Sequence, residues 1–498
     1  MTQLIVLVCM YMLVSVGIGL WAARRVRNTA DYALAGRSLP LAMVITATFA
    51  TWFGSETVLG LPGRFIEGGI SGVIEEPFGS GMALILVGMF FARKLYKMDL
   101  LTISDFYRRR YGRKIELACS IFIIVSYLGW VGAQVAALGL VLNLITEGAV
   151  SVSLGMTIGT FVVLFYTVYG GMWSVAFTDF FQMLIIVLGL AAIAFCAGDM
   201  AGGFTKVIDF AESRDLFNPW PEMSVSGWLF WISAAITMMI GSIPQQDVFQ
   251  RVMSAKSAGT AARGAAMGGA FYIVFAFVPM FIVCAAVLAM PGVGEMLLKT
   301  DPQRLLPTLV KDYMPGWLRV LFFGAVLSAV MSTASATMLA PSTTFVQNIL
   351  KGFVRISPDK ELTCMRATLT VFAVAVGFLP WRCSPTASGL KGRRFTTWWR
   401  WPISSRSWVR SGPWCAACTG SERLRRARGF PSSWAAPFGS RFRPHLWVKF
   451  SPRCWAALSL RRPAWSAGAF CPPAAMPATA AGRPSRCRLL NCCRMNAA

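Results

Sequence analysis

Residues 41–63 read LAMVITATFATWFGSETVLGLPG, an apolar stretch long enough to cross the hydrocarbon core of a bilayer as a helix. Gly54, Gly60 and the Pro62-Gly63 pair interrupt it. Backbone carbonyls freed at membrane depth persist only where they are buried in protein or line a cavity, and such broken helices hold ions and substrates in transporters. A kink that lets small residues pack closely is the alternative interpretation.

The carboxylate of Glu56 lies inside this stretch. An ionisable group within a membrane helix is costly and usually has a function or a partner. Glu56 would attract a cationic or amine-bearing substrate. Pairing with a cation of the protein itself is the alternative.

Ten apolar stretches of this kind occur in the first 379 residues, and 56% of the chain is apolar while only 14% is charged. A buried soluble core helix does not explain such a series, so the sequence predicts an all-α polytopic membrane protein. The segments are expected near residues 2–22, 40–62, 72–92, 117–143, 151–170, 177–198, 228–247, 265–290, 317–346 and 362–379.

The distribution of Lys and Arg between the loops predicts the orientation. With the N-terminus outside, the inside loops carry 18 basic residues and the outside loops carry six. We therefore expect an integral protein of the plasma (bacterial inner) membrane with its N-terminus outside. The basic clusters are interpreted as topology signals, and no nucleic-acid partner is expected.

The ninth segment is rich in hydroxyl groups, and the seventh is broken. Hard cations such as sodium prefer several oxygen ligands, although hydroxyls also form hydrogen bonds between helices. Gly241 and Pro244 break the seventh segment, and Gln245 follows at the break. Two broken helices five segments apart are the pattern expected of an inverted-repeat transporter.

The connection between the fifth and sixth segments has two features of its own. Gly170 and Gly171 permit a tight turn, and Asp179 follows near the expected start of the next helix. Asp179 is either an N-terminal cap or a residue on a cation-release path.

Four motifs in order are similar to the sodium:solute symporter family, near its choline and amino-acid branch, over residues 2–379. They are ATWFGSETVLGLPG, YGGMWSVAFTDFFQ, GSIPQQDVFQRVMSAKS and GAVLSAVMSTASATMLAPSTTFVQNIL. The resemblance implies a leucine-transporter-type bundle of two inverted five-helix repeats after an extra first helix. It also implies uptake of a small organic solute, coupled to sodium by alternating access, and no enzyme activity.

The resemblance also implies site residues. The main sodium site would use the carbonyls of Ala50, Phe53 and Ala329 and the hydroxyls of Ser332 and Thr333. A possible second sodium site would use Asp179, Ser332 and Ser335, but Ala336 stands where a further hydroxyl would help. Trp52 and Trp130 match two positions of an aromatic box, which binds quaternary ammonium by cation–π attraction. Gln245 replaces a third Trp of that box and Glu56 replaces a Gly, so an amino acid or other zwitterion is at least as good a candidate as choline.

Residues 380–498 have a different composition. They contain 19 Arg and two Lys against one acidic residue, Glu422, and supply +20 of the net charge of +25. No apolar stretch of about 20 residues occurs there. We interpret this part as a basic, disordered and out-of-frame tail that leaves the second repeat incomplete, which sequencing of the locus would test. A basic extension that binds nucleic acid or anionic lipid is the rival interpretation.

Two alternatives to a working symporter stay open. A membrane-embedded solute sensor would bind ligand without accumulating it, and an inactive remnant would not insert or fold. The identity of the solute, the sodium stoichiometry and the oligomeric state do not follow from the sequence.

Overall fold

The computed structural model describes residues 2–300 and 305–383. The chain divides into two units, 1–420 and 421–498, so the described residues all belong to the first. The predicted tail from residue 384 onward lies outside the described residues. Within the described ranges the chain is helical, and its β structure is a single bridge between Leu39 and Ala255, which confirms the all-α prediction.

The helices follow the predicted segments in order. The first half contains α1 (Thr2–Ala23), α2 (Thr29–Leu34), η1 (Ala35–Arg37), α3 (Leu41–Ala50), η2 (Glu56–Gly60), α4 (Leu61–Gly72), η3 (Ile74–Gly79), α5 (Ser80–Leu86), η4 (Val87–Phe91), α6 (Ala92–Lys97), α7 (Ile103–Tyr111), α8 (Arg113–Ile145) and α9 (Val152–Met200). The second half contains α10 (Phe204–Ser213), α11 (Val225–Gly241), α12 (Gln246–Met253), α13 (Ala258–Phe275), α14 (Phe277–Ala289), α15 (Val293–Thr300), α16 (Leu305–Thr308), η6 (Leu309–Tyr313), α17 (Gly316–Thr344), η7 (Phe345–Leu350), α18 (Lys351–Phe353) and α19 (Pro358–Cys383).

Six helical spans in the described ranges are long and apolar enough to cross a membrane, and a seventh is counted if the bent pair α11–α12 is one span. This number is smaller than ten for structural reasons. The second segment is split into short helices, and α9 contains the fifth and sixth segments together. The count of ten stays a prediction.

The second segment is broken between α3 and η2. Residues 51–54 are non-helical, so the break precedes Gly60 and the Pro62-Gly63 pair. The seventh segment is also broken, with an angle of 47° between α11 and α12. Both predicted interruptions are therefore present in the structure.

The kink in α9 falls at Gly171, which has φ 50° and ψ −137°. A Cβ atom there would lie 2.3 Å from the carbonyl oxygen of Tyr32, so the chain needs glycine at this point both for conformation and for space. Asp179 lies eight residues further on, inside the helix, and the interpretation of Asp179 as an N-terminal cap was therefore wrong.

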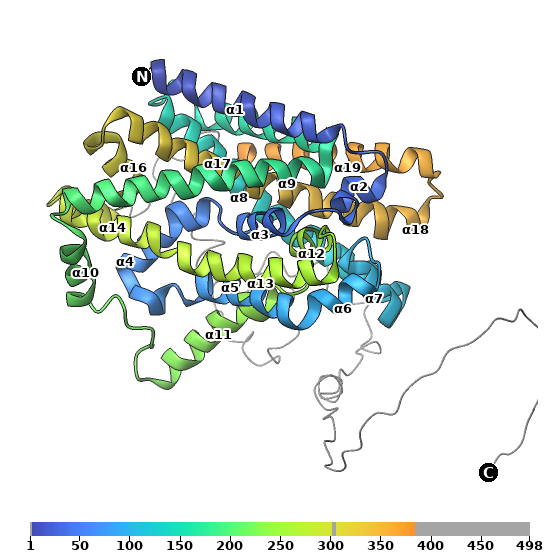
Figure 1. The fold of residues 1–498 in the computed structure, drawn as a ribbon, viewed down its shortest axis with the longest axis horizontal. Helices are drawn as coiled ribbons and strands as arrows, with labels where there is room; N and C mark the ends of the chain where they lie inside the picture. Colours follow the sequence, from blue (N-terminus) through green and yellow to red (C-terminus); the bar gives the residue numbers. More distant parts are fainter. Residues whose placement is uncertain (1, 301–304, 384–498) are drawn as a thin grey trace, which may run out of the picture. The chain divides into compact units, whose positions relative to one another are not determined.

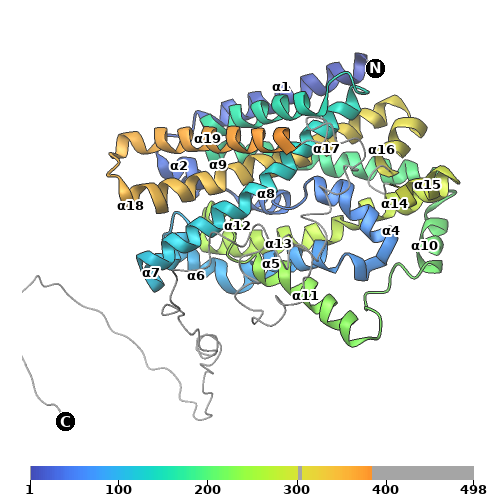
Figure 2. The ribbon, with the colours of Figure 1, turned by 180° about the vertical axis from the view of Figure 1, so that it is seen from behind.

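The core of the described part is built around α17. Every residue from 322 to 344 of this helix is buried, and 83% of its most apolar window is buried, against 22% for α1. Figures 1 and 2 show α1 at one edge of the helical bundle and α11 at the opposite edge. Large apolar side chains on the outer helices, such as Leu13, Phe161 and Leu188, are exposed, as expected of a surface that faces lipid.

Candidate functional site

The break in the second segment packs against α17. The hydroxyl of Thr333 lies 3.5 Å from the carbonyl oxygen of Ala50, the last residue of α3, although 283 residues separate them. The same hydroxyl lies 3.1 Å from the carbonyl oxygen of Ala329, one turn earlier in α17. Three of the five residues expected at the main sodium site therefore meet at one point.

Gly54 allows this close approach. A Cβ atom at Gly54 would lie 2.7 Å from the hydroxyl oxygen of Thr333 and 3.5 Å from the side-chain oxygen of Gln134 in α8. The adjacent Ser55 donates a hydrogen bond to that same oxygen of Gln134 at 3.1 Å. Carbonyl and hydroxyl oxygens of this kind suit a hard cation such as sodium without adding a buried net charge.

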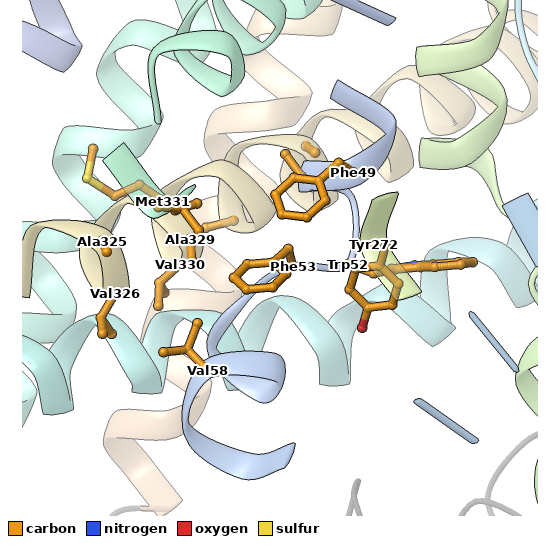
Figure 3. Packing of buried hydrophobic residues seen from close by; sticks show 14 of the residues in the cluster. Phe49, Trp52, Phe53, Val58, Tyr272, Ala325, Val326, Ala329, Val330 and Met331 are labelled. Carbon is orange, nitrogen blue, oxygen red and sulfur yellow. The ribbon is translucent and has the colours of Figure 1, made fainter. Parts of the chain in front are cut away.

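Phe53 packs on the same side of the break. Its ring is fully buried and stacks on Phe49 with 4.8 Å between the ring centroids. Figure 3 shows the two rings next to Ala329 of α17, with Trp52 and Tyr272 on the other side of Phe53. All four of these aromatic side chains are buried beside the break.

Ser332 and Asp179 form a second group. The Ser332 hydroxyl donates a hydrogen bond to Asp179 at 2.5 Å, and Ser335 donates to the carbonyl oxygen of Ser332 at 2.9 Å. The other carboxylate oxygen of Asp179 lies 3.2 Å from the guanidinium of Arg251 in α12. Both oxygens of Asp179 thus have partners within the protein.

Arg251 is one of the 18 basic residues of the predicted inside loops. In the structure it lies in α12, where every residue is buried, and only 1% of its side chain is exposed. The excess of basic residues in the inside loops does not depend on this one residue.

The aromatic residues expected at the substrate site divide between two places. Trp130, in α8, stacks on Tyr127 with 5.9 Å between centroids, and the Tyr127 hydroxyl donates to Asp247 of α12 at 2.5 Å. Gln245 is the N-cap of α12 and so lies near this pair. In the described part of the chain, no ring contact joins Trp52 to Trp130.

A buried carboxylate that the sequence analysis did not single out lies near Trp52. Glu76 accepts a hydrogen bond from the Tyr272 hydroxyl at 2.8 Å and lies 3.5 Å from the Thr57 hydroxyl. Thr57 also donates to the carbonyl oxygen of Trp52 at 2.9 Å, which joins this group to the break. The signal was present in the sequence, since Glu75 and Glu76 are charged residues within an apolar segment.

Three acidic residues lie close together in this region. Glu56, Glu75 and Glu76 interact electrostatically with one another and with Arg64, whose guanidinium lies 3.6 Å from Glu76. Glu56 therefore has a protein cation nearby, which it shares with two other carboxyl groups. These carboxyl groups are candidates to receive a cationic group of a bound solute.

The fold places two broken helices around a buried, hydroxyl-rich helix, which is the arrangement of leucine-transporter-type membrane transporters. Residues 32–386 match the profile of the sodium:solute symporter family. The chain belongs to this family.

Named relatives and one solved structure agree with this assignment. The chain is 28% identical to the high-affinity choline transporter 1 of Torpedo marmorata over 74% of its own length, and it spans 66% of that protein. It is 29% identical to the high-affinity proline transporter PutP of Bacillus subtilis (strain 168), with 75% of this chain and 80% of that protein covered. The structure of a Na+-coupled sialic acid symporter in a substrate-bound outward-open state has the same fold, with a TM-score of 0.69 at 18% identity, covering 78% of this chain and 82% of that one. These relatives are transporters and not enzymes.

Proposed function

We propose that the chain is a sodium-coupled symporter that imports a small organic solute with a cationic amine, such as an amino acid or a choline-like compound, by alternating access. The observation that carries the proposal is the contact of the Thr333 hydroxyl with the carbonyl oxygens of Ala50 and Ala329 at the helix break. One sodium ion would bind there, with Phe53 and Ser332 as further ligands. The protein would lie in the inner membrane with its N-terminus outside.

Coupling follows from the position of this site. A cation bound between Ala50 and Thr333 would hold the break against α17. The same break carries Trp52 and, through Thr57, the carboxylate of Glu76. Sodium would therefore order the groups that receive the solute, so that each ligand raises the affinity for the other. Trp52, Glu56 and Glu76 would contact the cationic end of the solute, and Trp130 and Gln245 would lie at its other end.

The test uses the purified full chain in proteoliposomes with an inward sodium gradient, screened with choline, betaine, proline and other amino acids. Sodium-dependent accumulation of one of them is the expected result. The variants Trp52→Ala, Glu56→Gln and Ser332→Ala should each weaken solute binding, the last mainly through sodium affinity.

Other outcomes separate the alternatives. Solute binding without accumulation would favour the sensor, and three silent variants would show that the site is misplaced. A chain that neither inserts nor binds any of these compounds would favour the inactive remnant.

A further inference from the structure

Arg251 is an unusual residue for its position. It lies in α12, it is almost completely buried, and α12 also buries Gln246, Asp247 and Gln250. A buried guanidinium persists only beside a negative partner. The partner here is Asp179, at 3.2 Å, in the middle of α9.

The surroundings of Asp179 are those of a small cation site. Asp179 is fully buried, the Ser332 hydroxyl donates to one of its oxygens, and Ser335 lies one turn further along α17. A carboxylate with two neighbouring hydroxyls could hold a second sodium ion. The Ser332 hydroxyl donates to one carboxylate oxygen of Asp179, and the Arg251 guanidinium lies 3.2 Å from the other. This positive charge already neutralises the carboxylate and would repel a second cation, so the residues as arranged do not fit a second sodium.

We propose that Arg251 is a resident cation that replaces a second sodium ion at Asp179, so that the protein binds a single sodium ion. Asp179 is then a positioning residue. It accepts the hydrogen bond of the Ser332 hydroxyl, with 2.5 Å between the two oxygens, and so fixes the orientation of this side chain next to Thr333. Because the guanidinium is covalently attached, its charge cannot be released inside the cell with the solute.

A second carboxylate, Asp247, also lies near Arg251. It has an electrostatic interaction with Arg251, one of its oxygens accepts from Tyr127 at 2.5 Å, and the other is buried without a hydrogen-bond partner. The experiment must therefore distinguish Asp179 from Asp247 as the group that Arg251 neutralises.

The test is direct measurement of the sodium ions bound per chain, by equilibrium dialysis of radioactive sodium against the purified full chain without solute. We expect the wild type to bind one ion with a Hill coefficient of about one. Arg251→Gln should expose Asp179, add a second ion and raise the Hill coefficient. Arg251→Lys keeps the charge and should retain one ion.

The double variant Asp179→Asn with Arg251→Gln removes the carboxylate and the cation together, and it should return to one ion. Arg263→Gln is the matched control, since Arg263 is an exposed arginine of α13. If Arg251→Gln does not fold, the wild type and the double variant can still overturn the proposal. Two sodium ions bound to the wild type and one bound to the double variant would show that Asp179 is a sodium ligand despite Arg251.

This proposal rests on the proposed function, but the experiment distinguishes failure of the Arg251 proposal from failure of the symporter proposal. One ion in both the wild type and a folded Arg251→Gln would overturn the role of Arg251 and leave the symporter intact. A second ion that persists in the double variant would move the site to Asp247. Absence of bound sodium in all of these variants would overturn both proposals.

Discussion

At the scale of single residues, the contact between Thr333 and the carbonyl oxygen of Ala50 is the most informative. We expect Thr333→Ala to lower sodium affinity about tenfold, which corresponds to about 1.4 kcal/mol, because it removes one oxygen ligand. Sodium titration of solute binding measures this. Thr344→Ala is the matched control, since Thr344 is a buried threonine of the same helix whose hydroxyl also bonds one turn back, to Ala340 at 3.1 Å. Equal effects of the two substitutions would indicate a general defect of α17.

Glu76 is the second residue whose role can be tested. Glu76→Gln keeps the shape but removes the charge, and we expect it to weaken binding of a cationic solute about tenfold or more, as for the loss of a charged hydrogen bond. Tyr272→Phe leaves the carboxylate but removes its donor at 2.8 Å and should have a smaller effect. Isothermal titration calorimetry with the solute found in the uptake screen measures the affinity of both variants.

Glu147→Gln provides the control for this charge removal, because Glu147 belongs to a half-exposed ion pair with Lys311. Such pairs contribute little to stability. Solute affinity that does not change in Glu76→Gln would remove this carboxylate from the binding site.

The sequence anticipated some of these residues and missed others for a physical reason. An oxygen-rich helix and a broken helix are visible as local patterns, but spacing alone does not bring Ala50 next to Thr333, and only the family resemblance paired them. The pairing of Arg251 with Asp179 could not be predicted, because 72 residues separate the two in the sequence. Glu76 stands out locally as a charge within an apolar segment, but its contact with Tyr272 could not be predicted, because 196 residues separate the two.

At the scale of elements, the break between α3 and η2 depends on Gly54. We expect Gly54→Ala to lower both sodium and solute binding, because the added Cβ would lie 2.7 Å from the Thr333 hydroxyl and push the break away from α17. Gly60→Ala should leave binding unchanged, since a Cβ atom there meets no atom within 4 Å. Binding assays on the two variants give the comparison, and normal binding by Gly54→Ala would show that the break need not touch α17.

The end of α17 is held by a buried amide. Asn348, in η7, donates to Asp105 of α7 at 2.8 Å and to Glu116 of α8 at 2.9 Å, and its oxygen accepts from Thr102 at 2.7 Å. Asn348→Ala removes three buried hydrogen bonds, although Glu116 and Asp105 keep other partners, and we expect a loss of about 3 kcal/mol in the free energy of unfolding, seen as a lower Tm in detergent. Gln347→Ala, at the neighbouring half-buried position, should change stability by about 0.5 kcal/mol or less.

The observed helix boundaries show which sequence features predict structure well. The length of the apolar stretches predicted the helices, and glycine and proline residues predicted the two broken segments. The break in the second segment lies at residues 51–54, before the proline, because contacts with α17 and Gln134 stabilise the chain there. Gly171 was predicted as a turn residue, and the kink of α9 lies there. The position of Asp179 inside α9 was not predicted, because an acidic residue near the expected start of a helix is typical of an N-terminal cap.

At the scale of the whole molecule, one expectation concerns the orientation of the protein in the membrane, and the other concerns the residue at which the symporter sequence gives way to the basic tail. The family match stops at residue 386, close to the change of composition after residue 379. The out-of-frame origin of the tail stays a prediction, because the tail lies outside the described residues. Orientation can be tested on the described part itself.

We expect residue 223 outside and residue 110 inside. Met223 is 90% exposed in the connection between α10 and α11, which lies in a loop poor in basic residues, whereas Arg110 is exposed at the end of α7 within the most basic loop. Because basic loops remain on the cytoplasmic side, a membrane-impermeant maleimide should label Met223→Cys in intact cells and Arg110→Cys only after permeabilisation. The wild type supplies the background from its own cysteines. The reverse pattern would invert the topology and, with it, the direction in which an inward sodium gradient drives the solute.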